Sequence, residues 1–259
     1  MRHAGFLLFW ILFLVHSSKA FFLYADEGVS GLTGRWGPGA SVAVFRENPA
    51  LIGGKSRMGA LYSRKYGFRE LDLKTVAWSG GAERLRWGIL LRQYQKRPLQ
   101  ENEGLLSLSF PLAEGLRGGV GLKCLYGVLM EEALYAFSWD LGIVWSADSL
   151  GFHVSFLNGE HPVLKEEVAH TVIAGGALHR PPLHLFAKGA SVHEGNSYGV
   201  ISLFYDLTPM LSLGYGLNTG NGEHRCVLDL ARGAFSLKLA YVVPRILPRY
   251  ISTEVGITW

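Results

Sequence analysis

Two side chains capable of covalent chemistry stand two residues apart in the run His153-Val154-Ser155. A histidine and a serine on one strand face can act as the base and the nucleophile of an outer-membrane phospholipase. Alternate strand residues point to opposite faces, and the apolar Phe152, Val154 and Phe156 occupy one of them. His153 and Ser155 therefore face away from the lipid on which such enzymes work. No catalytic residue is predicted.

Metal and phosphate sites need residue spacings that this sequence does not show. The glycine-rich run 118–121 has no following lysine and serine or threonine, so it is not a phosphate-binding loop. The histidines outside the first run have no metal-ligand spacing with a cysteine or a carboxylate cluster; they include His184, His193 and His224. Neither a metal nor a cofactor is predicted.

The elements that carry these residues are expected to be β-strands with two unlike faces. In the segment 135–145, aromatic and aliphatic side chains alternate with small and polar ones, and the segments 210–218 and 235–241 repeat this division. A soluble β-sandwich also alternates, but its inner faces must fill a core and would not place Gly, Ser and Lys opposite continuous apolar rows. The pattern favours an all-β fold, a transmembrane outer-membrane β-barrel.

About fourteen antiparallel strands are predicted, an even number as in bacterial barrels. With both chain ends in the periplasm, the turns after even-numbered strands should be the short ones, as at Arg180-Pro181 and Arg232-Gly233. The longest outer loops are expected at Gln95 to Glu103 and Asn158 to Glu167. The predicted strands lie near 58–67, 70–79, 84–93, 104–111, 117–127, 133–145, 149–157, 168–177, 182–192, 198–206, 209–218, 224–231, 234–242 and 249–259.

Both ends of the chain indicate the bacterial outer membrane. Arg2 is followed by the apolar run Gly5 to Val15 and then by small residues, so a signal peptide is expected over residues 1–20. A membrane anchor is the alternative, but the run is too short to span a bilayer. The last strand ends on Trp259, and a terminal aromatic fits the interfacial girdle of a closed barrel.

The composition of the exported chain bounds its partners. Residues 1–20 contain Arg2 and Lys19, so 25 − 2 = 23 basic side chains remain against 21 acidic ones. This near-neutral balance suggests no nucleic-acid partner. Cys124 and Cys226 fall on the lipid-facing parity of separate strands, which favours isolated thiols over a disulfide.

Charged side chains of both signs are assigned to the lumen face of the predicted strands. One interpretation is mutual salt bridging that also anchors a plug, and the other is a weakly anion-selective aqueous path. The first is favoured because lumen side chains of plugged barrels are normally paired. The predicted lumen-lining residues are Asp72, Lys74, Arg86, Arg92, Lys123, Asp140, His153, Lys188, Asp229 and Lys238.

A glycine-rich segment that fits no strand, residues 21–57, lies between the signal peptide and the first strand. A periplasmic tail is one interpretation. The run Ser41 to Phe45 is too apolar for a free tail, and a barrel of about fourteen strands leaves a lumen wide enough to need a plug. We therefore interpret residues 21–57 as an N-terminal hatch and residues 58–259 as the barrel.

The small residues 39–44 are followed by Asn48-Pro49-Ala50 and then by the predicted barrel. This order resembles the FadL-type long-chain fatty-acid transporters and their relatives, the PorV-type barrels of type IX secretion. The resemblance implies that Asn48, Pro49 and Ala50 belong to a hatch with a gating role. Pro49 would fix the local turn. Asn48 would either bond the hatch to the wall or only close an Asx turn.

Two functions are compatible with this resemblance. The first is passage of small hydrophobic or amphiphilic molecules through a hatch-gated lumen. The second is a non-transporting, PorV-like scaffold that binds a periplasmic or secreted protein. The transporters of the family build a hydrophobic capture groove from extracellular loops, and the short loops predicted here favour the second function. Outer-membrane lipid is an expected partner in both.

Overall fold

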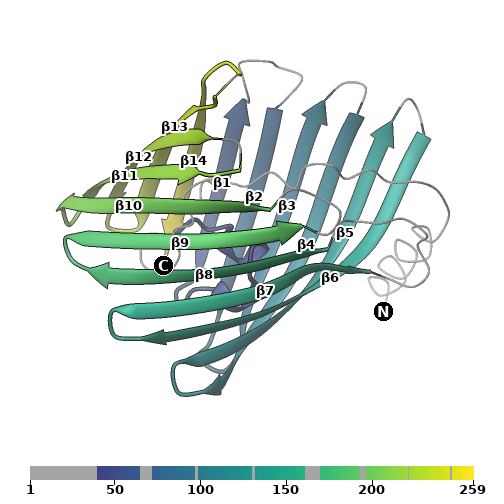
Figure 1. The fold of residues 1–259 in the computed structure, drawn as a ribbon. Coiled ribbons are helices and arrows are strands. Elements are labelled where there is room, and N and C mark those ends of the chain that lie inside the picture. The colour runs from purple at the N-terminus through teal and green to yellow at the C-terminus, as the bar shows by residue number, and fades with distance from the viewer. Residues whose placement is uncertain are drawn as a thin grey trace.

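The computed structural model describes residues 40–64, 72–96, 99–129, 132–160, 170–192, 197–220, 222–245 and 247–259. Fourteen antiparallel strands form one closed barrel, in which each strand pairs with the next and β1 pairs with β14 (Figure 1). The predicted strand number is confirmed. The strands are β1 (Arg57–Arg64), β2 (Asp72–Gly81), β3 (Arg86–Lys96), β4 (Leu99–Ala113), β5 (Leu116–Leu129), β6 (Glu132–Ala147), β7 (Leu150–Glu160), β8 (Thr171–Arg180), β9 (Leu183–Val192), β10 (Tyr198–Thr208), β11 (Leu211–Asn218), β12 (Glu223–Arg232), β13 (Phe235–Val243) and β14 (Tyr250–Thr258).

The prediction of a loop between Gln95 and Glu103 is wrong. β3 and β4 continue through most of it and pair as far as Lys96 opposite Leu99. The polar run there keeps the period of two, with Glu101 and Glu103 buried on the inner face, so it extends the wall. Most of the other long loop expected, Asn158 to Glu167, lies outside the described residues.

The wall of the barrel is uneven in height. β4, β5 and β6 have 15, 14 and 16 residues, whereas β11 has 8. Ser138 of β6 lies opposite Glu160, the last residue of β7, so the start of β6 extends past β7. Figure 1 shows the long strands β4 to β6 next to one another in the wall.

The outward face of the wall is apolar along most strands. On β6, Leu141 and Ile143 are 46% and 51% exposed, while the inward Asp140 between them and Trp139 is 1% exposed. Aromatic pairs such as Trp78 with Trp87 lie on this outward face near the end at which β1 begins and β14 ends. Such a surface suits a lipid solvent. Cys124 and Cys226 are free thiols, as predicted. None of the described helices is long and apolar enough to cross a bilayer.

Residues 40–56, which we call the inner segment, lie inside the barrel before β1 begins at Arg57 (Figure 1). They form two short 3-10 helices, η1 (Val44–Arg46) and η2 (Pro49–Leu51). Ser41 to Phe45 are all buried, which confirms that this run is not a free tail. The expected signal peptide at 1–20 and the first part of the predicted hatch, 21–39, lie outside the described residues.

Candidate functional site: the lumen and its inner segment

Asn48 fixes the inner segment both to itself and to the wall. Its side-chain oxygen accepts a hydrogen bond from Ala50 N at 2.9 Å and so caps η2, which begins at Pro49. Its side-chain nitrogen donates to the backbone oxygens of Ile143 and Val154, both at 3.1 Å. The bond to the wall and the local turn, which the sequence analysis gave as alternatives for Asn48, therefore occur together. The Asn48 side chain is completely buried.

The wall opposite the inner segment is built with glycines where contact is closest. A Cβ added at Gly142 would lie 2.0 Å from Asn48 Oδ1, and one at Gly119 would lie 2.3 Å from Ala50 N. At Gly88, an added Cβ would lie 2.9 Å from the ring of Phe45. These separations are too short for any side chain. The missing side chains create the space in which the inner segment lies.

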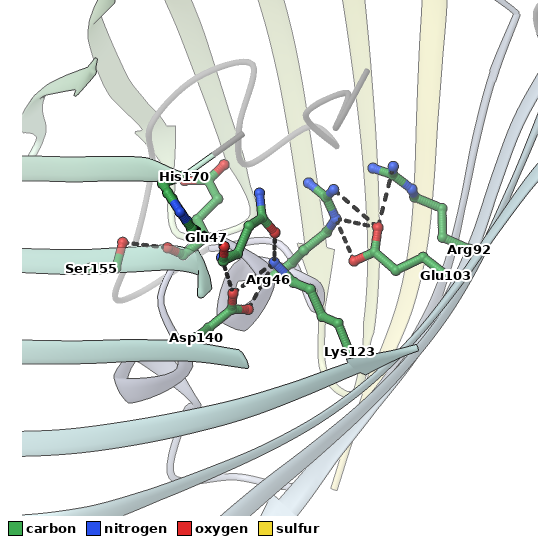
Figure 2. Close-up of polar contacts among 9 residues, drawn as sticks. Arg46, Glu47, Arg92, Glu103, Lys123, Asp140, Ser155 and His170 are labelled. Atoms are coloured by element: carbon green, nitrogen blue, oxygen red, sulfur yellow. Dashed lines mark hydrogen bonds and ion pairs between the residues drawn. The ribbon is translucent and has the colours of Figure 1, made fainter. Parts of the chain in front are cut away.

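Arg46 connects the inner segment to the wall by charge. Its guanidinium donates to Glu103 through Nε at 3.0 Å and through Nη2 at 3.0 Å, a bidentate pair (Figure 2). Arg92 contacts the same carboxylate from β3 at 3.3 Å. Burial acts to lower the pKa of Arg46, but the nearby carboxylates of Glu103, Asp140 and Glu47 together outweigh it, so the pKa lies above its usual value. Arg46 is therefore a permanent cation here.

The next residue, Glu47, makes contacts on the opposite side of the segment. Its carboxylate accepts from Lys188 Nζ at 3.1 Å. Its backbone oxygen accepts from the Ser155 hydroxyl at 2.7 Å (Figure 2). Ser155 thus holds the inner segment, consistent with the inward direction predicted from its parity. His153 is also buried on the inner face.

Both ends of the inner segment are attached as well. Near its start, Glu254 of β14 accepts from the Ser41 hydroxyl at 2.5 Å and from Val42 N at 3.1 Å. Near its end, Arg86 Nη1 donates to the Ile52 carbonyl at 3.1 Å. β14 and β3, three strands apart in the closed sheet, are therefore joined through the same short segment.

Most of the predicted lumen charges are placed as expected. The wall holds further pairs among its own side chains: Lys123 Nζ lies 2.8 Å from Asp140, and Lys238 Nζ lies 2.8 Å from Asp229. This is the mutual salt bridging favoured from the sequence. The predicted lumen residues that point inward are Arg86, Arg92, Lys123, Asp140, His153, Lys188, Asp229 and Lys238.

Asp72 and Lys74 are the two corrections to that set. The burial of β2 alternates, with Leu73 and Thr75 on the buried inner face, and this alternation puts Asp72 and Lys74 on the outer one. Lys74 is exposed in phase with Val76. The period of two therefore decided their direction, whereas the prediction assumed that charge must avoid the lipid-facing side.

The inner wall also carries an apolar surface, which the sequence analysis did not single out. Phe186 and Phe204 meet edge to face with ring centroids 5.9 Å apart. They belong to a buried cluster that includes Ala40, Val44, Ala50, Leu61, Leu73, Tyr94, Val144, Ala177, Val227, Ala240, Val242 and Tyr250. The inner segment therefore lies between a charged network and an apolar wall.

A cavity of about 590 Å³ opens beside the inner segment, at the end of the barrel where β1 begins and β14 ends. Its lining includes a hydrogen-bonded chain of side chains. His179 Nδ1 lies 3.3 Å from His184 Nδ1, His184 Nε2 lies 2.8 Å from Asp206, and the Ser212 hydroxyl donates to Asp206 at 2.6 Å. Sequence spacing gave no sign of this chain because its members come from four different strands.

Comparisons with known proteins place this geometry in a fold class. No protein-family model and no curated protein sequence matches the chain. The CymD monoaromatic hydrocarbon channel has a TM-score of 0.67 at 9% identity, over 92% of this chain and 98% of its own. The Ralstonia pickettii toluene transporter TbuX has a TM-score of 0.66 at 11% identity, over 92% and 98%. A Pseudomonas aeruginosa FadL homologue has a TM-score of 0.63 at 10% identity, over 93% and 99%.

The protein therefore has the architecture of an outer-membrane β-barrel. More closely, its fold is that of the FadL-type barrels, as the resemblance seen in the sequence predicted. At these identities the likeness concerns the fold, so what passes or binds must be argued from the lumen itself.

Proposed function

We propose that the protein lies in the bacterial outer membrane and passes small hydrophobic or amphiphilic molecules through its lumen, with the inner segment as the gate. The buried apolar cluster around Phe186 and Phe204 supports this, because it includes residues of the inner segment, and displacement of that segment would offer apolar side chains of the wall to such molecules. The proteins with the same fold include ones described as a hydrocarbon channel and a toluene transporter. The cavity of about 590 Å³ on the other side of Ala40 and Val42 would receive them.

The observation that carries the gating role is how the inner segment is held. As far as Ile52, its described contacts with the wall are side-chain hydrogen bonds, ion pairs and apolar packing, as at Asn48, Arg46 and Glu47. Its last residue, Ser56, next to β1, accepts a backbone hydrogen bond from Trp259 N at 3.0 Å. The strands pair with one another, and the closed ladder does not include the inner segment. The segment can therefore move without opening the barrel.

A reversible lock on the inner segment tests this proposal. In a background where Cys124 and Cys226 are replaced by alanine, Asn48→Cys is combined with Gly142→Cys. The Asn48 amide, which leaves no room for a side chain at Gly142, is absent from this double variant. A Cβ at Gly142 would lie 2.7 Å from the position of Asn48 Cγ, which the sulfur takes in Asn48→Cys, so the two sulfurs come within bonding reach. We expect flux of a long-chain fatty acid into liposomes when the lock is reduced and loss of flux when it is oxidised.

Matched controls separate gating from leakage. Asn48→Cys alone should give the same flux under both redox conditions. A chain lacking residues 21–56 should leak without saturation, because the space filled by the inner segment is then open. Equal flux from the reduced and oxidised double variant would reject the gate.

A second function is favoured by the number of anchors on the inner segment. Arg46, Glu47 and Asn48 all have buried partners on the wall, an arrangement suited to a permanent plug. In that case the barrel is a PorV-like scaffold for a periplasmic or secreted protein. Absence of flux in both redox states, together with a stoichiometric partner recovered from detergent-solubilised membranes, would support the scaffold.

A further inference from the structure

The outward face of β1 and β2 carries charge where lipid contact is expected. Arg64 Nε donates to Asp72 at 3.0 Å, and the Tyr62 hydroxyl donates to the same carboxylate at 2.9 Å. The Arg64 guanidinium also lies 5.9 Å from the centre of the Tyr62 ring. Lys74 is exposed on the same face, opposite Tyr62 in the strand register. Two cations and one carboxylate leave this cluster net positive.

This cluster is unlike the rest of the outward wall. Among the described side chains, the other outward-facing lysines and arginines within strands are Arg180 and Arg232. Each is the last residue of its strand, at the end of the barrel where β1 begins and β14 ends. Arg64 and Lys74 belong to neighbouring strands and face the same way, so their charges act together.

The depth of Lys74 on the wall strengthens the case for an anionic partner. Trp78 packs against Trp87 with ring centroids 4.9 Å apart. It marks the boundary of the apolar band at the end of the barrel where β1 begins and β14 ends. Lys74 is four residues from Trp78 on β2, about 14 Å along the strand. At a tilt of about 35–45° this is roughly 10–11 Å across the membrane, well short of an apolar band of about 25 Å.

β6 gives the normal spacing for comparison. Ten residues separate Trp145 from Tyr135, which is about 34 Å along the strand and roughly 24–28 Å across the membrane. The apolar band is therefore complete on β6 and cut short on β2. A cation at the level of Lys74 needs a negative group that reaches it from the lipid side.

We propose that Arg64 and Lys74 bind the phosphate of a lipid headgroup on the outer surface of β1 and β2. Both side chains are long enough to extend toward the headgroup layer, and a phosphate offers oxygens to both at once. The Arg64 guanidinium is already oriented by Asp72, which leaves its remaining N–H groups for the lipid. The proposal rests on the membrane location proposed above.

Native mass spectrometry of the detergent-solubilised full chain tests this site, with phosphatidylglycerol and diacylglycerol as matched lipids with and without phosphate. The wild-type protein should retain phosphatidylglycerol in preference to diacylglycerol. Lys74→Gln with Arg64→Gln should weaken that retention about tenfold, the effect of losing charged hydrogen bonds. Arg232→Gln, an outward-facing arginine at the other end, should leave it unchanged.

Other results would overturn the proposal. Equal retention of both lipids, or equal loss in the Arg232→Gln control, would mean that the cluster has no headgroup selectivity. Displacement of phosphatidylglycerol by millimolar inorganic phosphate would indicate a site for free phosphate. Heat-modifiable migration on a gel must show that each variant is folded. Because the readout involves no flux, failure here is distinguishable from failure of the proposed transport.

Discussion

At the scale of single residues, polar side chains on the inner wall are matched to groups on the inner segment. Asn48 uses its oxygen within the segment and its nitrogen on the wall, so one amide joins two backbones. Glu103 lies between Arg46 and Arg92, and Lys188 faces Glu47. Because these groups are buried, loss of one partner leaves the other without a substitute from water.

The two roles of Asn48 can be separated by substitution. Asn48→Asp keeps the oxygen that caps η2 but cannot donate to Ile143 and Val154, whereas Asn48→Ala loses both functions. We expect faster amide hydrogen exchange at residues 50–52 in both variants. Asn48→Ala should lose about 1 kcal/mol more of local stability, the typical contribution of an N-cap. Equal exchange in wild type and Asn48→Asp would contradict anchoring to the wall.

The position of Glu103 between two guanidiniums predicts an unequal pair of variants. Glu103→Gln leaves Arg46 and Arg92 buried without their carboxylate and should destabilise the folded protein by about 3–5 kcal/mol. Arg46→Gln should have a smaller effect because Glu103 keeps Arg92. Urea unfolding in vesicles, followed by tryptophan fluorescence, measures both. The opposite order would show that Arg46 is the more important member.

At the scale of elements, glycines on β3, β5 and β6 shape the wall for η1 and η2. Gly88, Gly119 and Gly142 face the inner segment at distances that leave no room for a Cβ. The strands there are among the longest of the barrel and remain paired through these positions. Flexibility is not the reason for these glycines, because what they supply is space.

Replacing a glycine by alanine tests whether the glycine provides space for the inner segment or only affects the strand propensity of the wall. Gly119→Ala places a methyl group 2.3 Å from Ala50 N, and we expect the barrel to fold with the inner segment displaced. Gly189→Ala is the matched control on β9, where an added Cβ meets nothing within 4 Å. Limited proteolysis near residues 40–56 should increase for Gly119→Ala only. Equal protection in both variants would contradict the close packing.

At the scale of the whole molecule, the barrel presents apolar side chains outward and charged pairs inward. Because β1 pairs with β14, the described strands include no edge strand, and the sheet ends only at the two rims of the barrel. Leu141 lies near the middle of β6, and Leu112 lies near the turn between β4 and β5. The lipid environment of these two exposed leucines therefore differs in depth.

This difference predicts a depth-dependent effect of charge. Leu141→Arg should destabilise the protein in vesicles by about 2–4 kcal/mol, and Leu112→Arg by about 0–1 kcal/mol. Both leucines are exposed, at 46% and 53%, so a water-soluble barrel would tolerate both changes equally. Denaturant titration in phosphatidylcholine vesicles and in detergent measures the two effects. Equal values would contradict the proposed membrane orientation.

Much of the fold could be predicted because lipid imposes a period of two on every strand. The alternation in β6 and β13 is evident in the sequence, and the apolar run Ser41 to Phe45 predicts a segment inside the barrel. The misplacement of Lys74 has an identifiable cause. Lys74 lies on the same strand face as Val76 and Trp78, but the prediction placed it in the lumen because it is charged.

The strand number, the two faces and the position of Asn48 before the first strand could be predicted because they depend on local spacing. Which groups meet depends on how the barrel closes. Arg46 and Glu103 are 57 residues apart, and Ser41 and Glu254 are 213 apart. Closing the ring brings such residues together, since the shear of the barrel and the path of the inner segment fix their distances. No local pattern contains that information.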